Sequence, residues 1–312
     1  MTGTSDMETA QHEAFLKGLR DLFAMLVEMD YLQSDDVSYP PHGDLTVEAL
    51  GAAGLEQEAV ELIACMPMLN GELCEREADF GHGVELAPSA SGVSYLSSQG
   101  IELARQDART DDEQLKPWMV RIARSNGVRG KDIVYDLLDG NMIEWNYEGT
   151  WQTVRQTPVE NYFQRWIENL RSLECLPWHD GFGYVIHARP TGYEAHLANP
   201  SKTLEDVQLR HLSLSTAGIT PPSIDEMFND HIEILKAEHN IFWSKRRLYE
   251  EAGRNRNFNH QKFRASREEY EQRFREATSL ARVRPKGQSI YNIEHGRQLR
   301  EWYRLMAREH GV

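Results

Sequence analysis

Three side chains that could bind a metal ion lie close together in the sequence: His187, Glu194 and His196. Apolar and polar residues alternate from 182 to 197, and a turn-forming sequence (RPTG) divides this stretch, so it is predicted to form a β-hairpin. Strand alternation would place the three side chains on one face, with His187 across from Glu194 or His196. Two imidazoles and one carboxylate, with coordination positions left open, are typical of a site for a divalent transition metal.

The same pattern has a second interpretation that needs no cofactor. Polar side chains normally occupy the solvent face of an antiparallel hairpin, and these three would then be ordinary surface residues. On the first interpretation the chain is an enzyme with a pocket at the 182–197 hairpin, where His179 and Asp180 add a ligand or orient one. In both cases the hairpin is the element that positions the side chains.

Cysteine chemistry is a further candidate. Cys175 lies near His179 and Asp180, but this spacing is not one that a cysteine enzyme requires. Cys65 falls on the apolar face of a predicted helix, where a buried and unreactive thiol is expected. The three cysteines lack paired close spacing, which argues against a disulfide framework and against a cysteine-based zinc site. The cytoplasm or the nucleus is therefore the expected location.

The stretch from 131 to 171 contains the pattern around which the other elements are arranged. Two short apolar strands flank the turn at Asp139-Gly140-Asn141, and Thr157-Pro158-Val159-Glu160 is typical of a helix start with a capping box. The helix that follows carries an apolar stripe of Tyr162, Phe163, Trp166, Ile167 and Leu170. A hairpin followed by an amphipathic helix is predicted, with Trp145 and Trp166 packed in the core.

The remaining patterns predict an α+β protein: a mixed domain with an antiparallel sheet and flanking helices, followed by further helices. A helix from 12 to 32 and a second one broken at Gly51 and Gly54 precede the irregular segment 71–115. The expected organisation is a disordered N-terminus at 1–11, an α+β domain at 12–215 and a helical extension at 222–312. The extension is predicted to hold a long helix to about 251, another at 263–280 and a last one near 299–306.

Charge divides the chain into an acidic body and a basic end. The net charge is −15, yet residues 241–312 hold 17 of the 34 Lys and Arg and only 9 of the 49 Asp and Glu. The end either folds back on the body or meets an anionic partner such as nucleic acid, through the basic residues Lys245, Arg246, Arg247, Arg254, Arg256, Lys262, Arg264 and Arg267. The basic residues alternate with Glu, which favours the first alternative, and no nucleic-acid-binding motif accompanies them. No apolar run suggests a membrane span.

Residues from about 44 to 172 resemble the SUKH superfamily of bacterial toxin-immunity proteins and fungal cell-wall regulators. The matching features are the sequence MPMLNG at 66–71, Asp136-Leu137 with the turn at Asp139-Gly140, and the aromatic helix at 157–171. The resemblance implies an α+β fold and action by binding another protein, without enzymatic activity. Residues 31–71 are also similar to uncharacterised proteins of filamentous fungi. A protein-interaction or regulatory module is therefore the leading functional expectation, with a protein as its partner.

Overall fold

The computed structural model describes residues 5–43, 45–75, 83–106, 115–126, 130–146, 155–179, 184–216, 218, 220–221, 223–253 and 257–280. The predicted α+β class is confirmed, since antiparallel sheets are flanked by helices and followed by further helices. The chain forms two compact units, Met1–Ala188 and Arg189–Val312. The division falls at 188–189, upstream of the boundary predicted near 215–222.

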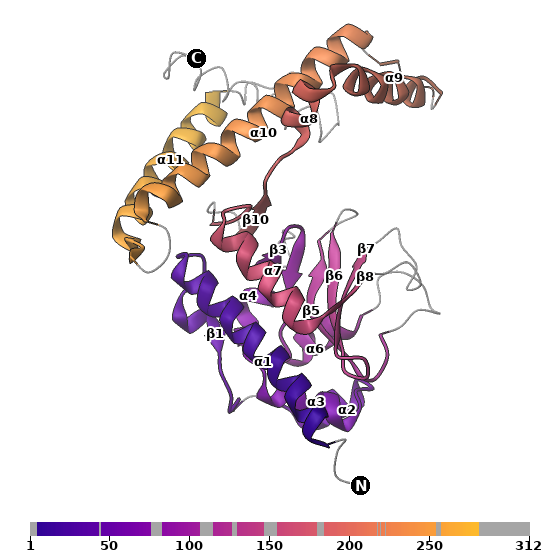
Figure 1. Ribbon diagram of the computed structural model, residues 1–312, viewed down its shortest axis with the longest axis vertical. Coiled ribbons are helices and arrows are strands. Elements are labelled where there is room, and N and C mark those ends of the chain that lie inside the picture. The colour runs from indigo at the N-terminus through magenta and orange to yellow at the C-terminus, as the bar shows by residue number, and fades with distance from the viewer. Residues whose placement is uncertain are drawn as a thin grey trace. The chain divides into compact units, whose positions relative to one another are not determined.

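The first unit is built on a six-stranded antiparallel sheet whose spatial order follows the sequence (Figure 1). Its strands are β3 (Glu85–Ala87), β4 (Ala90–Gly92), β5 (Met119–Ser125), β6 (Lys131–Asp136), β7 (Asn141–Asn146) and β8 (Arg155–Pro158). The helices are α1 (Ser5–Glu28), α2 (Val47–Ala52), α3 (Gln57–Cys65), α4 (Gly71–Glu75), α6 (Ser98–Arg105) and α7 (Val159–Arg171). A short pair, β1 (Val37–Ser38) and β2 (Met68–Leu69), lies apart from the sheet.

The predicted central hairpin is β6–β7. Val134 lies opposite Ile143 in the register, and Gly140 adopts φ 63° in the turn, a conformation that glycine reaches without strain. The predicted helix is α7, and all five residues of its stripe are buried. The predicted cap at Thr157 is wrong, because Thr157 belongs to β8 and pairs with Met142 of β7.

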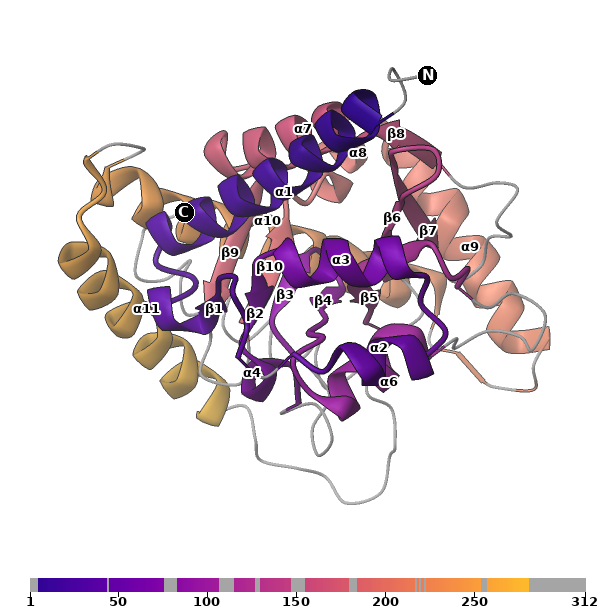
Figure 2. The same cartoon turned by 90° about the horizontal axis from the view of Figure 1, so that it is seen from below.

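Helices α1 and α7 pack together on one side of the sheet, and α6 lies on the other (Figure 2). On the first side the Phe15 ring of α1 stacks on Tyr135 of β6, with the ring centroids 4.2 Å apart. Gly18 permits the close crossing of α1 and α7, because a Cβ there would lie 2.3 Å from Cδ2 of Phe163. The predicted core positions of Trp145 and Trp166 are confirmed, with both side chains buried.

The predicted hairpin at 182–197 is wrong. Residues 184–188 do form a strand, β10 (Tyr184–Ala188), but it pairs with the preceding strand β9 (Cys175–His179). Pro177 in β9 had indicated a chain stop, yet proline is tolerated in edge strands, where its missing N–H faces away from the ladder. Gly192–Ala198 forms helix α8, because alternation over so few residues does not separate a strand from a short helix rich in Ala, Glu and Leu.

The predicted disorder at 1–11 is also wrong for residues 5–11, which begin α1. Residues with high helix propensity, such as Met7, Glu8 and Ala10, allow the helix to begin before the first residue of its apolar stripe. The predicted division of the second helix into two pieces is confirmed, since α2 and α3 are separate helices, but the break falls at Gly54 and Gly51 lies within α2.

Within the described residues, the second unit is built from helices. They are α8, α9 (Pro200–Thr216), α10 (Ile224–Ala252) and α11 (His260–Leu280). Ser223 and Glu226 form a capping box at the start of α10, and Gly253 ends the helix at φ 98°. Tyr249 and Phe263 join α10 to α11, with ring centroids 4.3 Å apart. The linker at 285–287 and the helix near 299–306 lie outside the described residues.

Candidate functional site

An open groove of about 450 Å³ runs between α2 and α6 in the first unit. Ala49, Ala52 and Ala53 form the α2 wall, and Ile101, Glu102 and Arg105 form most of the α6 wall. The groove is mostly apolar, with polar residues along its α6 side. A mostly apolar concavity with a few placed polar groups is the usual character of a binding site.

The α2 wall has a fixed length because its C-terminus is closed by a Schellman motif. Gly54 adopts φ 80°, its N–H donates to the Gly51 carbonyl, and the Leu55 N–H donates to the Leu50 carbonyl. Leu50 and Leu55 are both buried and anchor this end of the helix. The alanines at 49, 52 and 53 follow helical spacing and therefore share one side of α2.

The α6 wall is fixed at its N-terminus by a cap and by close packing. The Ser97 hydroxyl accepts a hydrogen bond from the Gly100 N–H at 3.0 Å. A Cβ at Gly100 would lie 2.4 Å from the Ser94 carbonyl oxygen, so a larger residue would push the helix away. Ile101 and Ala104 are buried beneath the helix.

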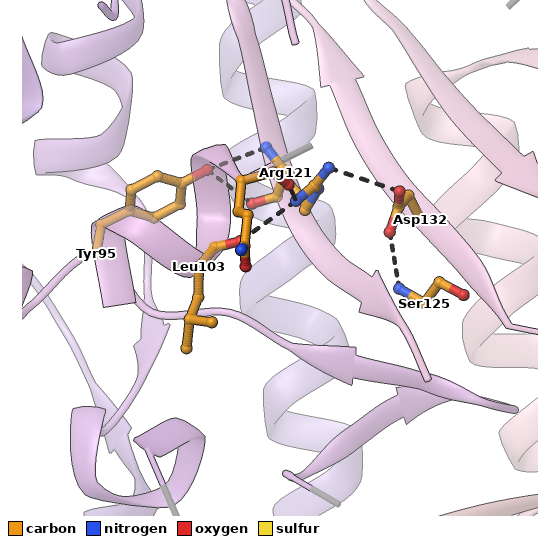
Figure 3. A network of polar contacts seen from close by, with 6 residues as sticks. Tyr95, Leu103, Arg121, Ser125 and Asp132 are labelled. Carbon is orange, nitrogen blue, oxygen red and sulfur yellow. Dashed lines mark hydrogen bonds and ion pairs between the residues drawn. The ribbon is translucent and has the colours of Figure 1, made fainter. Parts of the chain in front are cut away.

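A buried polar cluster holds the C-terminal end of α6 to the sheet (Figure 3). The Arg121 guanidinium donates to the carbonyls of Leu103 and Gln106 at 3.3 and 2.8 Å, satisfying acceptors that a helix end leaves open. Its charge is balanced by Asp132 on β6 at 3.5 Å, and Asp132 also accepts from the Ser125 N–H. This cluster therefore holds the α6 wall of the groove in place.

Tyr95 belongs to the same cluster. Strand β4 ends at Gly92, opposite Ala123 of β5, so the backbone of Arg121 has no partner residue in β4. The Tyr95 hydroxyl donates to the Arg121 carbonyl and accepts from the Arg121 N–H, each at 3.0 Å, in place of a strand partner. Burial raises the pKa of Tyr95 to about 12, although the nearby Arg105 and Arg121 charges act in the opposite direction. The hydroxyl therefore stays protonated and keeps both bonds.

Arg105 ties α6 to the segment that also holds α2. Its guanidinium donates to the carbonyls of Leu115, Lys116 and Met119, and burial lowers its pKa. The Glu56 N–H, just beyond α2, donates to the Pro117 carbonyl at 3.0 Å. Both walls of the groove are thus attached to residues 115–119.

The three predicted metal ligands are not gathered on one hairpin. His187 lies on β10 in the first unit, opposite Leu176. Glu194 and His196 lie on α8 in the second unit, where residues two apart point to different sides of a helix. Glu194 accepts two hydrogen bonds from Arg189, which hold its pKa below the usual range. Among the described residues, no group of three or more His, Cys, Asp or Glu could hold a metal ion.

The cysteines take different positions. Cys175 and His179 lie four residues apart on β9, roughly 13 Å at the rise of a strand, too far for proton transfer between them. Burial, with the neighbouring Glu174 charge, raises the pKa of Cys175 to about 11, so the thiolate is scarce at neutral pH. The prediction that Cys65 is buried is wrong, because it is exposed at the end of α3. Cys65, Cys74 and Cys175 all lie among the described residues, and none of them forms a disulfide.

The predicted basic surface is partly neutralised within the second unit. Arg246 pairs with Glu250 and Arg247 with Glu251, each one helical turn away. Lys245 is buried, and Lys262 donates to the Glu251 carbonyl. Arg254 and Arg256 lie outside the described residues. Basic residues that alternate with Glu thus form pairs along α10.

Sequence reasoning missed the groove because it missed α6. Prolines, glycines and serines between 81 and 100 interrupt every helical pattern there, so the segment 71–115 was predicted to be irregular. The available signal was local: Ser97 as a cap, followed by Ile101 and Ala104 at helical spacing.

Comparisons of the chain with protein-family models, with curated proteins and with solved structures found no match. Among the helices described, none combines the length and the apolar character needed to cross a membrane.

Proposed function

We propose that this chain is a non-enzymatic protein-interaction module that binds a helix of its partner in the groove between α2 and α6. The observation that carries the proposal is the groove itself: open, mostly apolar and about 450 Å³ in volume. Its α2 wall is lined by alanines at 49, 52 and 53, and such small side chains let a second helix approach closely. Laying an apolar helix face into a groove is a common mode of peptide recognition.

The fastening of both walls supports a binding role. The α6 helix is held at its N-terminus by Ser97 and at its C-terminus by Arg121, and α2 is closed at Gly54. A groove that is already formed before binding lowers the ordering cost of association. The nearby polar side chains of Ser97, Arg105 and Arg121 hydrogen-bond to the backbone and hold the walls in place. This favours a binding role over a catalytic one.

Two further features agree with the proposal. The resemblance of residues 44–172 to the SUKH superfamily spans both groove helices and implies protein binding. Three cysteines without a disulfide fit a reducing compartment, so we place the protein in the cytoplasm or the nucleus.

The test is selection of groove-binding peptides followed by a blocking substitution. Helical peptides would be selected from a display library against the full chain, and their Kd measured by fluorescence anisotropy. Ala52 is exposed in the groove, so Ala52→Trp should fill it and weaken binding at least about tenfold, or about 1.4 kcal/mol. Ala265→Trp, on an exposed position of α11, is the matched control and should leave Kd unchanged.

Two outcomes would contradict the proposal. One is a selection that yields no binder. The other is a set of binders whose Kd is the same for Ala52→Trp and for the parent chain. Thermal melts of both variants, followed by circular dichroism, establish that they are folded.

A further inference from the structure

The charge around the groove shows which kind of helix would fit it. Residues 21–75, which include α2 and α3, hold 12 Asp and Glu and neither Lys nor Arg. Such a stretch creates a negative potential over the surface it forms. The first wall of the groove therefore lies in the most one-sided acidic part of the chain.

Two exposed carboxylates, one on each helix, place negative charge at the rim of the groove. Glu102 lines the groove from α6 and is exposed. Glu48 is exposed on α2 and lies one helical turn before Ala52, so it shares the side of α2 that faces the groove. The two helices thus each supply an acidic residue near the apolar floor.

Arg105 is the basic residue among those that line the groove within the described part of the chain. Its single positive charge offsets the two rim carboxylates only in part, and three backbone carbonyls of residues 115–119 hold its guanidinium in place.

From these observations we infer that the partner segment is a cationic amphipathic helix, with an apolar face against the alanine wall and Lys or Arg facing Glu48 and Glu102. The inference rests on the proposed function, since it specifies the chemistry of the helix that the groove binds. The apolar contact supplies affinity, and the acidic rim selects partners by charge and speeds their encounter. A helix with acidic flanks would meet like charge on both walls.

The experiment uses the full chain and three synthetic helical peptides of about 16 residues with one shared apolar face. Their polar faces carry Lys, Gln or Glu, and Kd is measured by fluorescence anisotropy at low and physiological salt. The Lys peptide should bind about tenfold or more tightly than the Gln peptide, with the Glu peptide weakest, and the difference should shrink as salt rises.

Substitutions then locate the effect. Glu48→Gln/Glu102→Gln should weaken the Lys peptide about three- to tenfold and leave the Gln peptide unchanged. The control Glu160→Gln/Glu168→Gln neutralises two exposed carboxylates on α7, across the sheet from α6, and should change neither peptide.

Each contrary result has its own meaning. Equal Kd for the three peptides, with all of them blocked by Ala52→Trp, overturns the charge inference and leaves the groove proposal standing. Lys-peptide binding that survives Ala52→Trp is adhesion to the acidic surface, and it overturns the inference. If none of the three peptides binds, both the inference and the proposed function fail.

Discussion

Glu144 links three elements of the first unit through one partly buried carboxylate. It lies on β7, 3.0 Å from the Lys131 Nζ on β6 and 3.7 Å from the Arg165 guanidinium on α7. Burial would raise its pKa, but the hydrogen bond and charge of Lys131, with Tyr162 and Arg165, outweigh burial and lower it. A lowered pKa in the folded state means that the carboxylate stabilises the fold above the unfolded pKa.

Glu144→Gln should therefore destabilise the protein at neutral pH by about 1–2 kcal/mol, because the amide keeps the shape and loses the charge-assisted bonds. The deficit should shrink as the pH falls below the ordinary glutamate pKa and disappear below the lowered pKa of the folded state, where the parent carboxylate is itself protonated. Urea unfolding at several pH values measures it. Glu13→Gln, at an exposed position of α1, is the control and should change stability by less than about 0.5 kcal/mol. A deficit that does not depend on pH would show that lost packing is the cause.

Burial of charge is also where residue-level reasoning from the sequence fell short. In the sequence, Val120 and Ile122 flank Arg121, and strand alternation places Arg121 on the face opposite to these apolar residues, where a charged side chain normally meets solvent. Instead β5 is covered on both sides, and Arg121 is buried with Asp132 as its partner. The partner comes from the neighbouring strand and the receiving carbonyls from α6, so no local pattern could have shown the pairing.

At the scale of elements, the sequence predicted best where one face is apolar and the chain is long. The stripe of α7 and the hairpin β6–β7 have this character, and both were predicted within a few residues. The β9–β10 pair was not predicted, because Pro177 and the glycines at 181 and 183 weakened the strand pattern of this region. The sequence of α8 instead alternates like a strand and was predicted to be one. Short elements take their conformation from their neighbours, and their sequences do not contain that information.

Two glycines offer a matched test of how helices pack. Gly18→Ala should destabilise the protein by about 1–3 kcal/mol, because the new Cβ would meet the Phe163 ring and force α1 from α7. Gly51→Ala makes the same change inside α2, where nothing lies within 4 Å, and should stabilise the protein by about 0.5–1 kcal/mol. Chemical denaturation of both variants measures the two effects. Equal effects of the same sign would contradict the close crossing of α1 and α7.

The candidate site also shows what sequence alone could not reach. Ala49, Ala52 and Ala53 carry no chemical signal, and they become one wall of a groove only because α6 packs opposite them. The residues that did carry a chemical signal, His187, Glu194 and His196, are divided between two units. The candidate site is therefore built from ordinary residues, and only their placement in the fold brings them together.

For the whole molecule, the structure predicts that the first unit folds without the second. All six strands of the main sheet and the helices on both of its faces lie within Met1–Ala188, and so does the β9–β10 pair. A unit with its own hydrophobic core satisfies the usual requirement for an independent domain. A fragment of residues 1–188 should therefore be soluble and melt cooperatively, with a near-ultraviolet circular dichroism signal from its buried tryptophans.

The matched control is a fragment that ends at Arg171 and so lacks β9 and β10. It loses the buried side chains of Leu176, Trp178 and Ile186, each worth about 1.5–3 kcal/mol of burial. It also loses the Ile186 N–H that donates to the buried Glu85 carboxylate at 2.8 Å, and a buried carboxylate deprived of a donor is costly. This shorter fragment should therefore melt well below the longer one, or fail to fold. A 1–188 fragment that aggregates while the full chain folds would show that the first unit depends on residues 189–312. Equal melting of the two fragments would mean that β9 and β10 contribute little to its stability.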